Sequence, residues 1–297
     1  MNDLHLPAGS AGEDGDPVVV TPERAGWAYS GLRVIRLQPG ESRTIETGGN
    51  EMLILPLSGS CAVRCDGLRC VLAGRRSVFS RVSDFAYVPI AARVEIRSDA
   101  GGEFALPMAR AERRLDPRYG PAEEVRLEVR GAGGATRQVT NFCSPETFPA
   151  DRLMAVEVLT PAGNWSSYPP HKHDEVREGE AVLEEIYYYR IAGPRGFGFH
   201  RTYAADGAFD VTATVGDGDV FLVPRGYHGP CAATPNHDMY YLNVLAGPGP
   251  GRSMAFCDDP AHHWIRDAWP ALARDPRVPM SSATENKNKN EGAERNV

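Results

Sequence analysis

Short apolar runs bounded by glycine, proline, aspartate or asparagine recur along most of the chain. They are rich in valine, isoleucine, tyrosine and phenylalanine, as in LRVIRL, MLILPL, FAYVPI, EEIYYYRI, DVFLVP and MYYLNVLA. Because short bounded runs of β-branched and aromatic residues are typical of strands, we expect a mostly β protein built as a sandwich or barrel. Helical spacing is confined to residues 110–114 and 260–275, which predicts only a few short helices.

The strand pattern of the first half returns in the second half. EMLILPLSG at residues 51–59 matches EIYYYRIAG at residues 185–193, and FAYVPIAAR at 85–93 matches VFLVPRGYH at 220–228. The intervals nearly agree, with 38 positions from Glu51 to Pro89 and 39 from Glu185 to Pro224. A repeat of this length predicts two tandem β domains of one design.

We expect the domains to occupy residues 1–125 and 126–280, because the glycine-rich stretch RGAGGATRQ breaks the apolar pattern between the two halves. The last stretch, SSATENKNKNEGAERNV at residues 281–297, has almost nothing to bury and is expected to be a disordered tail.

Composition and charge narrow the class of protein. The 297 residues are 42% hydrophobic and 24% charged, and the formal net charge of -7 disfavours a general binder of nucleic acid or membrane surfaces. The N-terminus is polar and acidic, unlike a signal peptide, and no apolar run approaches the roughly 18 residues of a membrane span. The six cysteines form no CxxC pair, which favours reduced, partly buried thiols in a cytoplasmic protein.

The stretch PPHKHDEVREGEAVLEEIYYYR at residues 169–190 carries the candidate chemistry. His171 and His173 are two residues apart, so on an extended strand both side chains leave the same face. Glu185 opens a tyrosine-rich strand, and His228 follows a VPRGYH turn at the end of another strand. Three imidazoles and one carboxylate inside a small barrel would bind one divalent metal ion and leave positions open for substrate.

Three glutamates compete for the place of the carboxylate ligand. Glu178 has a spacing after His173 that is common in metal-binding barrels, but it lies in a polar segment that predicts a hairpin tip. Glu185 shares its face with aromatic residues and is favoured, because it would be held in place and desolvated. Glu184 is expected to face the other way.

The N-terminal half is expected to bind no metal. It places Glu51 against Glu185 in the repeat but has Arg93 against His228, and its segment GESRTIETGGNE contains no HxH pair. We therefore expect one metal site per chain and a structural or covering role for the N-terminal domain.

At these residues the sequence resembles the cupin superfamily, and its tandem halves resemble a bicupin. More narrowly, PPHKHDE, LEEIYYYR, GFGFHRTY, GDVFLVPRGYHGPC and YYLNVLAGP resemble the 5-deoxy-glucuronate isomerase family of myo-inositol catabolism. A related pattern, with a shorter gap between HxH and the glutamate, occurs in the 4-deoxy-L-threo-5-hexosulose-uronate ketol-isomerases of pectin breakdown. The resemblance spans nearly the whole ordered chain, and it implies His171, His173, Glu185 and His228 as the metal ligands.

The resemblance implies that a small sugar acid is the substrate: 5-deoxy-D-glucuronate, an aldose, and 5-dehydro-2-deoxy-D-gluconate, a ketose, are interconverted. One divalent metal ion per chain is implied, and zinc, iron, manganese and nickel all accept this ligand set. Such an ion would stabilise the anionic oxygens of an enediol.

The residues leave the general base and the partner of the substrate carboxylate open. A hydride shift would need no base, and a metal-bound hydroxide could also act as one. The candidate bases are Glu184, Lys172, His200, Tyr187, Tyr189 and Tyr241. The candidate substrate contacts are Arg190, Arg201 and Arg225 for the carboxylate and Tyr187 and Tyr241 for the wall of the site, where Tyr189 and Phe199 are also expected.

Two other functions use the same ligand set or fold. A cupin dioxygenase or oxidase would hold redox-active iron or manganese on three histidines and a glutamate, and it would consume oxygen. A regulatory sugar-binding cupin would carry a DNA-binding segment, for which the sequence offers no basic helix-turn-helix. The sequence leaves the oligomeric state open, although exposed strand edges could pair in a homo-oligomer.

Overall fold

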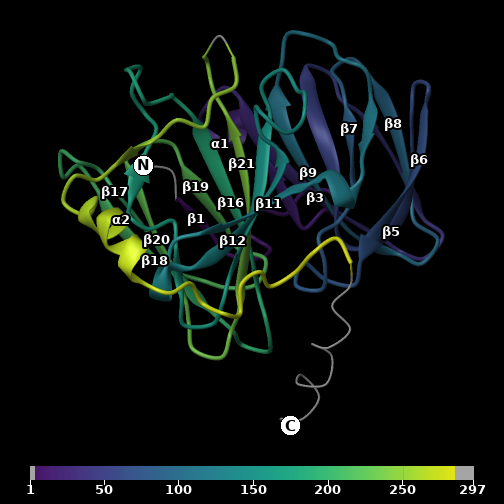
Figure 1. Ribbon diagram of the computed structural model, residues 1–297. Helices are drawn as coiled ribbons and strands as arrows, with labels where there is room; N and C mark the ends of the chain where they lie inside the picture. The colour runs from purple at the N-terminus through teal and green to yellow at the C-terminus, as the bar shows by residue number, and fades with distance from the viewer. Residues whose placement is uncertain (1–3, 250, 285–297) are drawn as a thin grey trace.

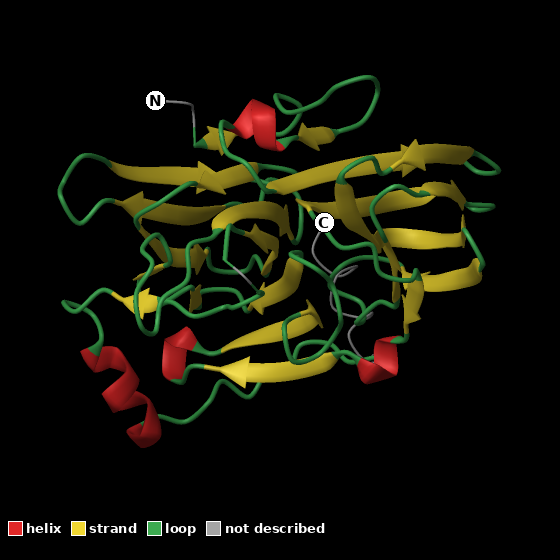
Figure 2. Ribbon diagram, turned by 90° about the horizontal axis from the view of Figure 1, so that it is seen from above, coloured by secondary structure: helices red, strands yellow, loops and turns green. Residues whose placement is uncertain are grey.

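The computed structural model describes residues 4–249 and 251–284, and it consists of two curled β bodies (Figure 1). The N-terminal half, purple to blue, forms one body, and the C-terminal half, green to yellow, forms most of the other. Strands make up most of the molecule, and the helices are short pieces at its periphery (Figure 2). The expectation of a mostly β protein with two tandem barrels and few short helices is confirmed.

One curled sheet forms the N-terminal body. Its main path runs β10-β7-β5-β9-β3-β2, with β6 and β8 also paired to β5, and β4 paired to β8. Its strands are β2 (Val18–Val20), β3 (Ser30–Leu37), β4 (Ser42–Glu46), β5 (Asn50–Cys65), β6 (Leu68–Arg75), β7 (Phe85–Val88), β8 (Arg93–Arg97), β9 (Gly102–Arg110) and β10 (Arg118–Gly120).

Two sheets face each other in the C-terminal body. The first, in order, contains β1 (His5–Leu6), β19 (Val220–Val223), β16 (Glu184–Ile191), β21 (Met239–Ala246), β13 (Met154–Thr160), β12 (Arg137–Cys143) and β11 (Arg126–Arg130). The second contains β18 (Asp210–Val215), β17 (Gly198–Tyr203), β20 (Tyr227–Ala233), β15 (His171–Lys172) and β22 (Cys257–Asp258), with β14 (Trp165–Ser166) also paired to β20.

The described helices are short. They are α1 (Pro22–Ala25), α2 (Trp264–Ala268) and the 3₁₀ turns η1 (Ala122–Glu124), η2 (Gly133–Ala135) and η3 (Trp269–Ala271). The helix expected within residues 260–275 is present, but the one expected at residues 110–114 is wrong. Strand β9 runs to Arg110, and the Asp151 carboxylate then accepts hydrogen bonds from the backbone amides of Glu112 and Arg113. A side chain from a distant segment thus takes donors that a helix would have used.

Both ends of the described chain cross the expected domain limits. Residues His5–Leu6 pair with β19, so the N-terminal segment is part of a C-terminal sheet. Near the other end, Ser281 is buried and bonds to Gln138, and the carbonyl of Ser282 accepts from the amide of Val82. The prediction of a disordered tail from residue 281 is therefore wrong for its first residues, and residues 285–297 lie outside the described residues.

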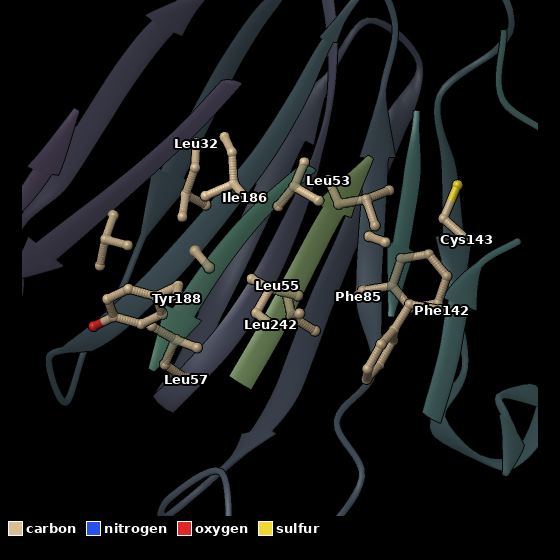
Figure 3. Packing of buried hydrophobic residues seen from close by; sticks show 14 of the residues in the cluster. Leu32, Leu53, Leu55, Leu57, Phe85, Phe142, Cys143, Ile186, Tyr188 and Leu242 are labelled. Carbon is tan, nitrogen blue, oxygen red and sulfur yellow. The ribbon is translucent and has the colours of Figure 1, made fainter. Parts of the chain in front are cut away.

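A large apolar cluster joins the two bodies. Figure 3 shows Leu53 and Leu55 of the N-terminal sheet close to Ile186, Tyr188 and Leu242 of the C-terminal sheet. These side chains are almost completely buried, and burying one such side chain stabilises a fold by roughly 1.5–3 kcal/mol. The two bodies therefore share a core, in addition to a separate core inside each barrel.

Two glutamates tie the bodies together reciprocally. The carboxylate of Glu184 accepts hydrogen bonds from three consecutive N-terminal amides, at 2.7 Å from Ala28, 2.7 Å from Tyr29 and 2.8 Å from Ser30. The carboxylate of Glu51 does the same for the C-terminal body. It accepts from the amides of Asp151, Arg152 and Leu153 at 2.9, 2.6 and 2.6 Å.

This symmetry corrects the sequence alignment of the repeat by one residue. Glu51 pairs with Ala109 on β9 as Glu184 pairs with Ala246 on β21, and Met52 pairs with Met108 as Glu185 pairs with Leu245. Glu51 is therefore the counterpart of Glu184, and Met52 occupies the place of Glu185. Arg93, which the alignment sets against His228, is exposed and lies 3.7 Å from Glu46.

The reciprocal glutamates generate a prediction about stability. Glu51→Gln and Glu184→Gln each replace a charged acceptor of three amides, so each is expected to lower the free energy of unfolding by about 2 kcal/mol. Urea unfolding followed by tryptophan fluorescence measures the change. Glu46→Gln, at an exposed glutamate, is the matched control and should leave the midpoint nearly unchanged. Equal midpoints for all three variants would contradict the role assigned to the two glutamates.

Candidate metal centre

A cavity of about 710 Å³ lies inside the C-terminal barrel. Its floor is the inner face of the first sheet, where alternate residues of neighbouring strands point inward. These are Arg137, Val139 and Asn141 of β12, Val156 and Val158 of β13, Tyr241, Asn243 and Leu245 of β21, and Glu185 and Tyr187 of β16. His171 and His173 lie at the same cavity, together with residues 252–256 of the chain segment that precedes α2.

His173, Glu185 and His228 form the tightest group of metal-ligating side chains among the described residues. One ligand atom from each lies within 4.8 Å of the other two, and all three side chains are buried. The Oε2 atom of Glu185 is 2.9 Å from Nε2 of His173 and 3.0 Å from Nε2 of His228. A single cation placed among these atoms would contact all three side chains.

The fourth predicted ligand, His171, lies next to this group. It pairs with His228 across β15 and β20, and the centroids of the two rings are 4.4 Å apart. It lines the same cavity but is not within the tightest group. Burial, followed by the neighbouring imidazoles His228 and His173, holds the pKa of His171 well below its ordinary value. The ring is therefore neutral at neutral pH, as a metal ligand must be.

All three histidines are oriented by the backbone in the same way. The Nδ1–H of His171 donates to the carbonyl of Pro169 at 3.3 Å, that of His173 to Leu183 at 3.1 Å, and that of His228 to Gly226 at 3.3 Å. A donor bond at Nδ1 fixes the tautomer that leaves the lone pair on Nε2. The three Nε2 atoms are thus the ones available to a metal ion.

The Nε2 atom of His228 and the Glu185 carboxylate are better arranged to bind a cation than to form a hydrogen bond with each other. His228 Nε2 is completely buried and has no hydrogen-bond partner among the described residues, although a carboxylate oxygen is 3.0 Å away. Burial raises the pKa of Glu185, but the neighbouring imidazoles of His228 and His173 outweigh it and hold that pKa well below its usual range, so the carboxylate is ionised. A buried lone pair beside an ionised carboxylate is the donor set of a divalent metal.

The predicted base Lys172 is not at the cavity. Its ammonium lies 2.6 Å from Asp174 and 2.8 Å from Glu180. Glu180 is buried and belongs to the hairpin that contains Glu178. Burial lowers the pKa of Lys172, but the hydrogen bonds to Asp174 and Glu180 raise it above its ordinary value. Lys172 is therefore a charged anchor of the hairpin, and Glu178 is exposed at its tip.

Glu184 and His200 are also engaged away from the ligands. Glu184 points out of the barrel to the N-terminal amides described above. His200 stacks on Phe221 and bonds through Nδ1 to the hydroxyl of Tyr189 at 2.6 Å and through Nε2 to Thr202 at 3.0 Å. Burial lowers the pKa of His200 to about 3, so it is a neutral core residue.

The three arginines chosen for their closeness in sequence all have carboxylate partners outside the cavity. Arg190 binds Glu103 and Asp217 at the junction of the two bodies. Arg201 binds Asp210 on the outer face of β17, and Arg225 lies 3.9 Å from Asp206. Phe199 is also on that outer face, 42% exposed, so it is not part of the wall of the site.

Tyr187 and Tyr241 do line the cavity, whereas Tyr189 packs behind them in the barrel core. The hydroxyl of Ser167 lies 3.3 Å from that of Tyr187 and 3.0 Å from that of Tyr241, which fixes both phenols. Burial raises the pKa of each phenol above its ordinary value, so both are hydrogen-bond donors rather than bases.

Sequence reasoning missed the polar residues that the other strands bring to the cavity. Arg137, Asn141 and Asn243 lie on its floor, and Arg252 lies at its wall. None is near the ligands in sequence, and the segment RQVTNFC of β12 has no alternation to mark an inner face because all of its residues are buried. For Arg137, Asn141 and Asn243, only the alternation of inward positions along β12 and β21 could have indicated that they face the cavity.

Among the described residues, no helix is both long and apolar enough to cross a membrane. The six cysteines are free, and most are buried.

Comparison with known proteins identifies relatives over nearly the whole chain. The model of the KduI/IolB family matches residues 5–265. The 5-deoxy-glucuronate isomerase of Geobacillus kaustophilus is 41% identical over 271 residues, which is 90% of this chain and 97% of the relative. The enzyme of the same name from Bacillus subtilis is 37% identical over 83% of this chain and 91% of its own length.

Solved structures agree with the fold. An IolB-like protein from Salmonella typhimurium superposes with a TM-score of 0.84 at 35% identity and covers 89% of this chain and 99% of its own. The oxalate decarboxylase of Lactobacillus farciminis superposes with a TM-score of 0.66 at 13% identity, over 87% of this chain and 89% of its own. The second likeness concerns the cupin fold alone.

The two adjacent glutamates provide a matched test of the centre. Glu185→Gln removes the buried carboxylate between the imidazoles, so the purified variant is expected to lose at least nine tenths of its bound metal, measured by elemental analysis. Glu184→Gln, one residue away on the opposite face, should keep a metal content within about 20% of the unmodified protein. Equal metal loss in both variants would mean that the effect comes from loosening the fold and would contradict the assignment of Glu185.

Proposed function

Because the chain belongs to the KduI/IolB family, we propose that it is a metal-dependent isomerase that interconverts 5-deoxy-D-glucuronate and 5-dehydro-2-deoxy-D-gluconate. The relatives named 5-deoxy-glucuronate isomerase are matched over most of both chains. The observation that carries the proposal is the convergence of the His173 and His228 imidazoles on the Glu185 carboxylate, with His171 beside them, at a cavity large enough for a six-carbon sugar acid.

The charge of the cavity suits an anionic substrate. Its lining includes five arginines but only three glutamates, one of which is the candidate ligand. A positively lined cavity with low-dielectric walls attracts anions and raises their local concentration. A neutral sugar would gain nothing from this excess of positive charge, whereas a sugar acid would.

We infer one divalent ion per chain, held by His173, Glu185 and His228 with His171 as the fourth ligand. When bound, such an ion supplies Lewis-acid stabilisation to the negative charge that develops on the carbonyl and hydroxyl oxygens of the substrate. Glu185 contributes one negative charge, and three neutral imidazoles contribute none, so the ligand set leaves the centre positively charged.

The protein's own residues orient the substrate. The phenols of Tyr187 and Tyr241 stay protonated and can donate hydrogen bonds to substrate oxygens, and Ser167 holds both of them in place. Val139, Val156 and Val158 supply an apolar part of the floor between these polar groups, against which the carbon chain of a substrate can pack.

The isomerisation moves one hydrogen from C2 to C1 of the sugar, and one proton from the C2 hydroxyl to the C1 oxygen. The phenols line the place where the oxygens lie, but their raised pKa values suit them to donate rather than to remove a proton. The other candidate bases bond to groups away from the ligands, so we assign no role in the hydrogen transfer to Glu184, Lys172 or His200. Transfer of the C2 hydrogen, as a proton through solvent or as a hydride directly to C1, is distinguished by isotope labelling.

We also infer that the reaction takes place in the cytoplasm, where free cysteines such as Cys143 and Cys231 stay reduced. Burial raises the pKa of both thiols to about 12, so neither is reactive.

The test is turnover of 5-deoxy-D-glucuronate by the purified protein, followed by NMR in deuterated water. We expect ketose formation that falls at least 100-fold after chelation and returns when zinc, manganese, iron or nickel is added. The rate should be the same with and without oxygen, because an isomerase consumes none, whereas a dioxygenase with this ligand set would stop under anaerobic conditions.

The position of the label separates the two hydrogen routes. Deuterium at the hydroxymethyl carbon of the ketose, which was C1 of the aldose, indicates proton transfer that exchanges with solvent, and its absence indicates a direct or shielded transfer. No turnover by protein with a full metal content would overturn the proposed activity.

A further inference from the structure

Arg137 is a buried cation on the cavity floor without an acidic partner. Among the described residues, no carboxylate lies within ion-pair distance of its guanidinium, and its one hydrogen bond runs from Nη1 to the carbonyl of Ala135 at 3.1 Å. The residue is 8% exposed and lines the same cavity as the metal ligands. Most of its five N–H donors are therefore left without an acceptor from the protein.

The other deeply buried arginine among the described residues, Arg75, has a structural role. Arg75 is also buried, but both of its terminal nitrogens bond to the Glu157 carboxylate, and its Nε donates to the carbonyl of Pro56. Burying a charge costs several kcal/mol unless a counter-charge and hydrogen bonds offset it. Arg75 has that compensation within the protein. Arg137 has one carbonyl acceptor and the ring of Trp269, whose centroid is 5.7 Å from its guanidinium carbon, but no counter-charge among the described residues.

The remaining arginines of the cavity are already engaged. Arg126 and Arg130 share the carboxylate of Glu128, and Arg266 forms two bonds with Asp258. Arg252 donates to the carbonyls of Leu153 and Phe148. Arg130 and Arg266 lie close enough to lower the pKa of Arg137, which burial brings to about 10, so the guanidinium is charged at neutral pH and surrounded by positive charge.

A second unpartnered donor lies between Arg137 and the metal ligands. Asn243 is 4% exposed, and its Nδ2 has no hydrogen-bond partner among the described residues. It is paired with Tyr187 across β16 and β21, one inward-facing position beyond Glu185, and it lines the cavity. By the register of the sheet, the inward positions run from Glu185 past the row of Asn243 and the row of Tyr241 and Val139 to Arg137, along one continuous cavity.

We propose that Arg137 binds the far-end carboxylate of the sugar-acid substrate, and that Asn243 donates a hydrogen bond to an oxygen between that carboxylate and the metal-bound end. This inference rests on the proposed isomerase function and names the residues that select an acid over a neutral sugar. Arg137 presents a fork of N–H donors that matches a carboxylate, and substrate binding supplies the counter-charge that the protein lacks. It is a specificity-determining residue, whereas the chemistry takes place at the metal-bound end.

The first experiment compares Arg137→Met with the unmodified protein on two substrates. These are 5-deoxy-D-glucuronate and its neutral analogue, in which a hydroxymethyl group replaces the carboxylate. We expect KM for the acid to rise about 30-fold or more, because a charge-assisted bidentate contact is lost, while kcat falls less. The constants for the neutral analogue should change less than about 3-fold, so the preference for the acid should largely disappear.

A second measurement does not depend on turnover. Binding of the reduced substrate, in which the aldehyde is an alcohol, is titrated by calorimetry against metal-loaded protein. We expect Arg137→Met to weaken this binding by the same factor as KM and to leave metal content unchanged. Asn243→Ala should weaken it by a smaller factor of about 5 to 10.

The controls separate a binding role from a structural one. Arg110→Met removes an exposed arginine that pairs with Glu23, and it should change neither constant. Arg137→Met should unfold at a temperature no lower than the unmodified protein, since it removes an uncompensated buried charge. Arg137→Lys, which keeps the charge but loses the fork, gives an intermediate KM and carries the test if the methionine variant does not fold.

The outcomes also separate this inference from the function on which it rests. If the unmodified protein does not convert the acid, the proposed function fails. If it does, but Arg137→Met and Arg137→Lys keep the same KM, the same affinity for the reduced substrate and the same preference for the acid, then Arg137 is not the carboxylate ligand.

Discussion

Strand β16 is buried on both faces, and the two adjacent glutamates at its start are used on opposite sides. One face, with Ile186 and Tyr188, packs in the core that joins the two bodies, and the other, with Tyr187, packs inside the barrel. Since the side chains of a strand alternate strictly, a slip of one residue would exchange the two glutamates. The docking of the domains and the position of the candidate metal ligand are therefore set by one register.

The same alternation explains which parts of the site could be predicted from the sequence. The HxH pair, Glu185 and His228 are marked by short-range spacing on strands, and the structure brings Glu185, His173 and His228 together, with His171 beside them. The register of the repeat could not be settled in the same way. Glu51 resembles either glutamate of the pair 184–185, and only the packing of its face against the other body identifies it as the partner of Glu184.

The candidate substrate-binding arginines show a different limit of prediction from sequence. Arg190, Arg201 and Arg225 are close to the ligands in sequence, yet each lies on an outward position and has an acid beside it. Arg137 is 34 positions before His171 and reaches the cavity because β12 and β13 lie beside β21 in the sheet. Strand order is a long-range property, and no local pattern of residues encodes it. The absence of an acidic partner can likewise be recognised only in three dimensions.

The two barrels share one arrangement of strands but differ in what fills their interiors. Inside the N-terminal barrel, Met52 stands in place of Glu185 among Ile54, Leu106 and other apolar side chains, so the interior is filled and satisfied. The C-terminal barrel instead contains a cavity, and its buried His228 Nε2 and Asn243 Nδ2 atoms have no hydrogen-bond partner among the described residues. Unsatisfied buried groups and an uncompensated arginine each cost stability, and such violations are expected where a ligand supplies the missing partner. The filled barrel, the shared core and the reciprocal glutamates offset this cost, which gives the N-terminal domain a physical role: it stabilises a neighbour whose interior is arranged for binding rather than for packing.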